Sequence, residues 1–178
     1  MSLESPTRAD AAEFHDLCAW IDTPPPDGLI RVANDDGETW TTRSHVEVAT
    51  AVRAFAAVLA AAGVGSGDTV AVAVPTGFDA ITAIFGAWRA GAAISMLPPP
   101  VLGGGEDYRT HLTALLGNAS ASAVVVAPEL RDILAGPAEQ AGITTLLQVG
   151  ETAIGAAVLR RRALTADDTA VVQFTSGS

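Results

Sequence analysis

Residues 69–97 read TVAVAVPTGFDAITAIFGAWRAGAAISML, and their pattern determines the fold class. It opens with a near-continuous apolar run over residues 69–74, which predicts a strand covered on both faces of a sheet. Apolar residues then recur at helical spacing over residues 77–90: Phe78, Ile81, Phe85 and Trp88. Residues 92–97 return to a strand pattern. A strand, a helix and a second strand in this order form one βαβ unit with parallel strands.

The same alternation continues downstream. Helices are predicted over residues 106–118 and 128–141, and strands over residues 123–126 and 144–149. Helices and strands that alternate in this way predict an α/β fold, with a doubly wound, mostly parallel sheet and helices on both of its faces. Crossover connections of this length are expected to be right-handed.

Upstream of the first strand, the pattern predicts a helix followed by a hairpin. Residues 10–21 have apolar positions at helical spacing, and Asp36-Gly37 predicts a tight turn between strands over residues 29–33 and 38–41. We therefore divide the chain into an N-terminal helix with a Pro-rich turn, residues 1–28, and an α/β subdomain, residues 29–178.

A further helix is predicted from about residue 42. Ser44 and Glu47 have the spacing of a capping box at its start, and Thr41 is the alternative cap. Gly63 and Gly65 end this helix just before the strand that begins at Thr69.

Composition excludes several classes of partner. The chain has 178 residues, 49% of them hydrophobic, and a net charge of -10, so that nucleic acid and anionic membrane surfaces are not expected partners. No signal peptide or membrane-inserted segment is predicted, and the expected location is the cytoplasm. All 10 basic residues are Arg, which excludes a lysine-containing Walker A loop.

Cysteine, histidine and tryptophan indicate structure rather than chemistry. Cys18, the single cysteine, is expected to be a small buried thiol, and a nucleophilic pair with a histidine lacks an identifiable third group. The three histidines have no ligand-like spacing: His15, His45 and His111. The three tryptophans are expected in the core or at its edge: Trp20, Trp40 and Trp88. No catalytic residue and no metal ligand is assigned.

The last ten residues predict a buried strand that runs directly into a polar turn. Residues 169–174 supply β-branched and aromatic side chains, and Thr175, Ser176, Gly177 and Ser178 follow at once. Hydroxyl groups and the backbone N–H groups of a glycine-containing turn suit phosphate oxygens, so these four residues are the candidate phosphate-binding site.

Four segments, taken in order, resemble the N-terminal region of the adenylate-forming enzymes. These segments are residues 38–41 (ETWT), 62–72 (AGVGSGDTVAV), 85–92 (FGAWRAGA) and 172–178 (VQFTSGS). The superfamily contains acyl-CoA synthetases, fatty acyl-AMP ligases, luciferases and the adenylation domains of peptide synthetases. The resemblance covers residues 29–178.

Within the superfamily, the chain most resembles the fatty acyl-AMP ligases. The resemblance rests on the proline run Leu97-Pro98-Pro99-Pro100 and on the helix that begins near residues 108–112 (YRTHL).

The resemblance implies a reaction in two halves, with ATP and Mg²⁺ as cofactors. A fatty acid attacks the α-phosphorus of ATP to give an acyl-adenylate and pyrophosphate, and the acyl group then passes to the thiol of an acyl carrier protein or of CoA. Thr175, Ser176, Gly177 and Ser178 match the start of the family's phosphate loop, and we expect them to bind the β- and γ-phosphates.

The family's phosphate loop continues as Thr-Gly-x-Pro-Lys-Gly, and its acid pocket, metal-binding glutamate and catalytic lysine come later still. This chain contains none of them. We therefore expect an N-terminal subdomain that is inactive by itself and self-associates through exposed apolar surface. An amino-acid or aryl-acid adenylation domain and a non-enzymatic α/β binding module remain as alternative hypotheses.

Overall fold

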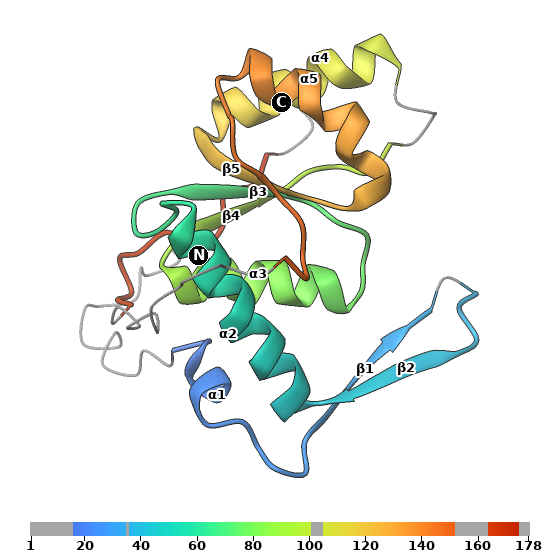
Figure 1. Cartoon of the computed structure of the whole chain (residues 1–178), viewed down its shortest axis with the longest axis vertical. Helices are drawn as coiled ribbons and strands as arrows, with labels where there is room; N and C mark the ends of the chain where they lie inside the picture. The colour runs from blue at the N-terminus through green and yellow to red at the C-terminus, as the bar shows by residue number, and fades with distance from the viewer. Residues whose placement is uncertain (1–15, 35, 101–104, 152–163, 175–178) are drawn as a thin grey trace, which may run out of the picture.

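A four-stranded parallel sheet forms the centre of the molecule (Figure 1). The structure is a computed structural model that describes residues 16–34, 36–100, 105–151 and 164–174. The strands lie in the order β4-β3-β5-β6, with these bounds: β3 (Thr69–Ala73), β4 (Ala93–Met96), β5 (Ala121–Val126) and β6 (Leu146–Leu147). Val70 pairs with Ile94 on one side and with Ala123 on the other. The predicted βαβ unit is confirmed.

Helices cover both faces of this sheet (Figure 1). Val70 and Val72 of β3 pack on one face with α2 (His45–Ala61) and α3 (Phe78–Ala90). Ala71 and Ala73 pack on the opposite face with α4 (Glu106–Asn118) and α5 (Arg131–Gln140). A short 3-10 turn, η2 (Pro128–Leu130), comes directly before α5. Because successive side chains of a strand point to opposite faces, the apolar run of β3 fills both cores. The predicted α/β fold is confirmed.

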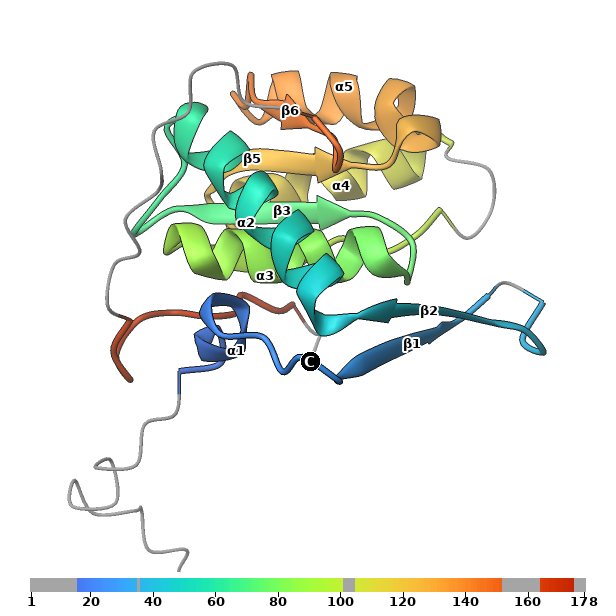
Figure 2. The same cartoon turned by 60° about the horizontal axis from the view of Figure 1, so that its bottom comes forward.

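A hairpin and a short helix pack outside the α2–α3 layer (Figure 2). Strand β1 (Leu29–Ala33) pairs antiparallel with β2 (Trp40–Ser44), and α1 (Ala19–Asp22) contacts α2. The antiparallel pairing is as predicted, but the second strand covers residues 40–44 rather than 38–41. The Asp36 carboxylate accepts hydrogen bonds from the N–H groups of Glu38 and Thr39, while Gly37 has a φ of 70°. The turn therefore uses the local acceptor and the positive φ that Asp and Gly supply.

Two predictions in this region need correction. Of the helix predicted over residues 10–21, the described part is helical only from Ala19, because the Asp16 carboxylate accepts a hydrogen bond from the Cys18 N–H and forms a turn there. Trp40 is not in the core but 53% exposed. It lies opposite Ala33 on the outer face of the hairpin, 5.2 Å from the Arg31 guanidinium.

The other two described tryptophans lie at the edge of the core, as predicted. Trp20 and Trp88 are half-buried and both meet the ring of Phe85 edge-to-face, with centroids 5.3 and 5.2 Å away.

Among the described residues, no helix combines the length and the apolar character needed to cross a membrane.

Gly86 sets how closely α2 and α3 approach. A Cβ at this position would lie 2.9 Å from Cδ1 of Phe55, a side chain that is itself buried. We predict that Gly86→Ala destabilises the fold by about 1–3 kcal/mol through overpacking, although alanine favours helices by about 0.5–1 kcal/mol. A Cβ at Gly117, in α4, would meet no neighbouring atom within 4 Å, which makes this glycine the matched control. Urea denaturation measures both, and equal effects of Gly86→Ala and Gly117→Ala would contradict close α2–α3 packing.

The predicted capping box at the start of α2 is confirmed. The Ser44 N–H and hydroxyl donate to Oε2 of Glu47 at 2.8 and 2.7 Å, and Ser44 Oγ accepts from the Glu47 N–H at 3.2 Å. These hydrogen bonds, the Ser44 hydroxyl first, lower the pKa of Glu47 below its ordinary value of 4.5.

A lowered pKa in the folded state stabilises the fold at pH values above the ordinary pKa, and this stabilisation is lost as the pH falls through the folded value. We therefore predict that Ser44→Ala costs about 1 kcal/mol at neutral pH and has a smaller effect below about pH 4.5. Thermal unfolding across this pH range measures the change. A loss of stability that is the same at every pH would contradict the role of the Glu47 carboxylate.

Candidate functional site

The last described segment, residues 164–174, runs beside β4 at the edge of the sheet. Val171 forms a parallel bridge with Ile94. The Ile94 N–H donates to the Ala170 carbonyl at 3.0 Å, and the Val172 N–H donates to the Ile94 carbonyl at 2.8 Å. The segment thus runs in the same direction as β3 (Figure 2). Its last described residue, Phe174, lies at the end of the sheet where the strands have their carboxyl ends.

The prediction that this segment is a buried strand is wrong. Val171 is 47% and Phe174 39% exposed, and the segment makes a single bridge rather than a continuous ladder. The reason is its position: it lies outside the edge strand β4, and within the described part of the chain no further strand pairs with its outer side. The four predicted phosphate-binding residues, Thr175 to Ser178, lie outside the described residues and come directly after this segment.

A groove of about 640 Å³ lies next to the segment at the carboxyl end of β4. One wall is the segment itself, with Phe174; another is α4, with His111 and Leu115; and the residues after β4, including Leu97, close it. Most of these side chains are apolar. In open α/β sheets, ligands bind beyond the carboxyl ends of the strands, so the groove has the location expected of a ligand site.

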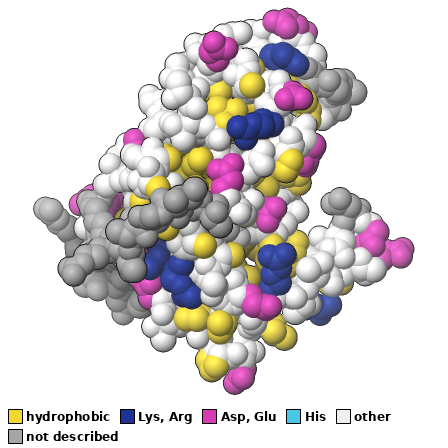
Figure 3. Space-filling view, in the orientation of Figure 1, with side chains coloured by type: hydrophobic (Ala, Val, Ile, Leu, Met, Phe, Trp, Pro, Cys, Tyr) yellow, Lys and Arg dark blue, Asp and Glu magenta, His cyan; other side chains and the backbone are white. Residues whose placement is uncertain are grey.

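A second cavity, of about 420 Å³, lies between the hairpin and the carboxyl ends of β3 and β5 (Figure 3). The strand order reverses between β3 and β5, which makes this the switch point of the sheet. Its lining is more polar and includes Thr76, Asp79 and Glu129. Arg43, also in the lining, holds its guanidinium 4.5 Å from the centre of the Phe78 ring.

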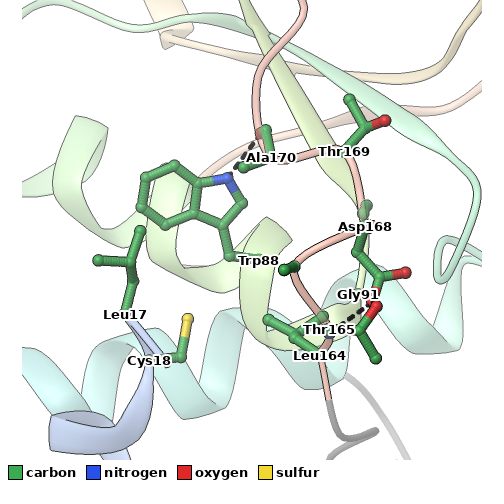
Figure 4. Close-up of a pocket in the computed structure, with 11 residues that line it drawn as sticks. Leu17, Cys18, Trp88, Gly91, Leu164, Thr165, Asp168, Thr169 and Ala170 are labelled. Carbon is green, nitrogen blue, oxygen red and sulfur yellow. Dashed lines mark hydrogen bonds between the residues drawn. The ribbon is translucent and has the colours of Figure 1, made fainter. Parts of the chain in front are cut away.

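A third cavity, of about 210 Å³, lies at the opposite, amino end of β4 (Figure 4). Leu17, Cys18 and Trp88 line one side, and the segment from Leu164 to Ala170 lines the other. Cys18 is fully buried, as predicted, and burial raises the pKa of its thiol to about 11. A thiol that stays protonated at neutral pH does not suit a nucleophile.

Trp88 is the residue that sequence reasoning missed. Its Nε1–H donates to the carbonyl of Ala170 at 2.8 Å, across 82 positions of the chain (Figure 4). Its place on the apolar face of α3 predicts burial, and no pattern in the sequence predicts a hydrogen bond to a distant carbonyl.

Metal ligands are not grouped in the part of the chain that the structure describes. There, no group of three or more His, Cys, Asp or Glu side chains is arranged so that it could hold a metal ion. His45 and His111 lie on different helices, and His15 is outside the described residues.

Comparison with known proteins agrees with this geometry. Residues 11–178 match the family model described as AMP-binding enzyme. The chain is 48% identical over 72 residues to an isonitrile lipopeptide synthase of Streptomyces coeruleorubidus. The aligned residues are 40% of this chain and 5% of that protein.

Two solved structures share the fold at low sequence identity. A structure from a study of fatty acyl-adenylate ligases of E. coli and L. pneumophila has a TM-score of 0.77 and 20% identity, over 94% of this chain and 31% of that chain. McyG A-PCP complexed with phenylalanyl-adenylate has a TM-score of 0.68 and 16% identity, over 83% of this chain and 27% of that chain. The chain thus spans less than a third of the protein or chain matched in each of these three comparisons. Its family follows from the match over residues 11–178: the chain belongs to the AMP-binding enzymes.

Proposed function

We propose that this chain is the N-terminal part of a longer ligase that uses ATP to activate a fatty acid as its acyl-adenylate. The observation that carries the proposal is the course of residues 164–174. They run parallel to β4, and the last described residue, Phe174, lies at the carboxyl edge of the sheet, beside the residues that follow β4. Ligands of open α/β sheets bind at this edge.

In this proposal, Thr175, Ser176, Gly177 and Ser178 bind the β- and γ-phosphates of ATP. Three hydroxyl groups and the N–H groups of a short turn are donors that suit phosphate oxygens, and glycine lets the backbone approach closely. ATP supplies the adenylyl group. Mg²⁺ is proposed as its counter-ion. We also propose that the chain is divided into an N-terminal helix with a Pro-rich turn, residues 1–28, and an α/β subdomain, residues 29–178.

The likeness to the fatty acyl-adenylate ligase structure supports a fatty acid as the substrate. The mainly apolar lining of the groove beside β4 is compatible with this class of acid. The proposed acceptor is the thiol of an acyl carrier protein or of CoA, and the proposed location is the cytoplasm.

An amino acid or aryl acid is the second candidate substrate. The observation that favours it is the likeness to McyG A-PCP, whose structure contains phenylalanyl-adenylate. A non-enzymatic binding module has no comparable support, because the chain belongs to an enzyme family.

We predict that the 178-residue chain has no ATP–pyrophosphate exchange activity, and that the protein extended through its downstream coding sequence does. The extended protein, assayed with a chain-length series of fatty acids and with the common amino acids, is expected to respond to fatty acids. Activity with amino acids alone would contradict the lipid substrate. Exchange by the 178-residue chain would contradict the division of the site between this chain and a further part.

We also predict that the 178-residue chain self-associates through the sheet edge formed by Met96, Val171 and Phe174, which are 47%, 47% and 39% exposed. Val171→Lys adds a charge to this edge and is expected to shift the chain toward the monomer. Leu29→Lys, at a 64% exposed residue on the hairpin, is the control. Light scattering after size-exclusion chromatography measures the mass, and a monomeric wild-type chain would contradict the prediction.

A further inference from the structure

We propose that Trp88 is a positioning residue that fixes the register of residues 169–174, and through them the place of the phosphate-binding residues next in the chain. The inference rests on the proposed function for the role of Thr175 to Ser178. The clamp itself, the pair of hydrogen bonds from Trp88 and Ile94 to Ala170, rests on contacts between described residues.

The first observation is that one carbonyl has two donors. The Ala170 carbonyl accepts from the Ile94 N–H at 3.0 Å and from Trp88 Nε1–H at 2.8 Å. A carbonyl oxygen has two lone pairs, so both hydrogen bonds are compatible. The indole comes from the last turns of α3 (Figure 4) and the amide from β4, so two separate elements locate the same atom.

The second observation is that residues 169–174 are mostly exposed. Residues 169, 170, 171, 173 and 174 are exposed, and a single bridge joins the segment to β4. Burial of side chains, which specifies the register of most strands, is therefore weak here. The Trp88 hydrogen bond adds a third to the two backbone hydrogen bonds of the bridge.

The third observation is that the indole is itself held firmly. Its ring packs edge-to-face on Phe85, with centroids 5.2 Å apart, and Phe85 meets Trp20 in the same way at 5.3 Å. Edge-to-face packing stabilises this orientation of the indole, in which the Nε1–H donates to the Ala170 carbonyl.

Register matters because the proposed phosphate-binding residues come directly after Phe174. A slip of one residue moves the downstream chain by about 3.3 Å and turns each side chain to the opposite face. Misplacing a reacting group by about 1 Å costs about 100-fold in rate. A device that prevents the slip therefore positions phosphate-binding groups without touching the nucleotide.

Amide exchange in the 178-residue chain tests the clamp. Trp88→Phe keeps an aromatic ring and removes the donor. It is expected to raise the exchange rates of the Val172 and Ile94 amides about five- to tenfold, the effect of one lost hydrogen bond. The amides of Val70 and Val124, in the centre of the sheet, should keep their rates. Trp20→Phe removes an indole of the same aromatic cluster and should leave Val172 unchanged.

A second variant separates the hydrogen bond from packing. Benzothienylalanine at position 88 has the shape of tryptophan but no N–H donor, and should reproduce the exchange rates of Trp88→Phe. Unchanged exchange at Val172 in both variants would overturn the clamp. Equal increases at Val172, Val70 and Val124 would also overturn it, because they indicate general loosening.

In the proposed longer ligase, Trp88→Phe should raise the KM for ATP and pyrophosphate about tenfold or more, with little change in the KM for the acid. Trp20→Phe should not. An equal loss with all substrates would overturn the positioning role. A wild-type ligase without exchange activity would contradict the proposed function instead, and the amide-exchange result would still decide the clamp.

Discussion

All five residues of β3 are buried, and the rest of the structure depends on this constraint. A strand buried on both faces and paired on both sides needs a helical layer above and below and a strand at each edge. The helices α2 and α3 form one layer, and α4 and α5 form the other. Strand β3 pairs in parallel with both β4 and β5, and the helices that connect these strands make the crossovers that parallel pairing requires.

The site depends on where this central sheet ends. The carboxyl ends of β3, β4 and β5 lie at one edge, and two cavities open there, one beside residues 164–174 and one beside the hairpin. The segment that leads to the proposed phosphate-binding residues has an exposed outer edge, in contrast to β3.

Much of the fold follows from local pattern. The run from Thr69 to Ala73 predicts a doubly covered strand, and Ser44 and Glu47 predict a capped helix, because both signals depend on neighbouring residues. Trp40 and Val171 were predicted to be buried because of their residue type, but both are exposed. Whether a residue at the edge of a sheet is buried depends on which other segments pack against it, and local sequence does not specify these segments. The Trp88 hydrogen bond joins residues 82 positions apart, and no local pattern specifies it. The candidate site residues, Thr175 to Ser178, follow from the resemblance and stay a prediction.

In the proposed function, residues 169–174 lead into a phosphate-binding turn at the carboxyl edge of the sheet. A crystal structure of the proposed longer ligase with a non-hydrolysable ATP analogue would show where the phosphates bind. The β- and γ-phosphates are expected to contact residues 175–178, which follow the segment beside β4. Phosphates bound in the cavity between the hairpin and the ends of β3 and β5, or away from the sheet, would contradict it.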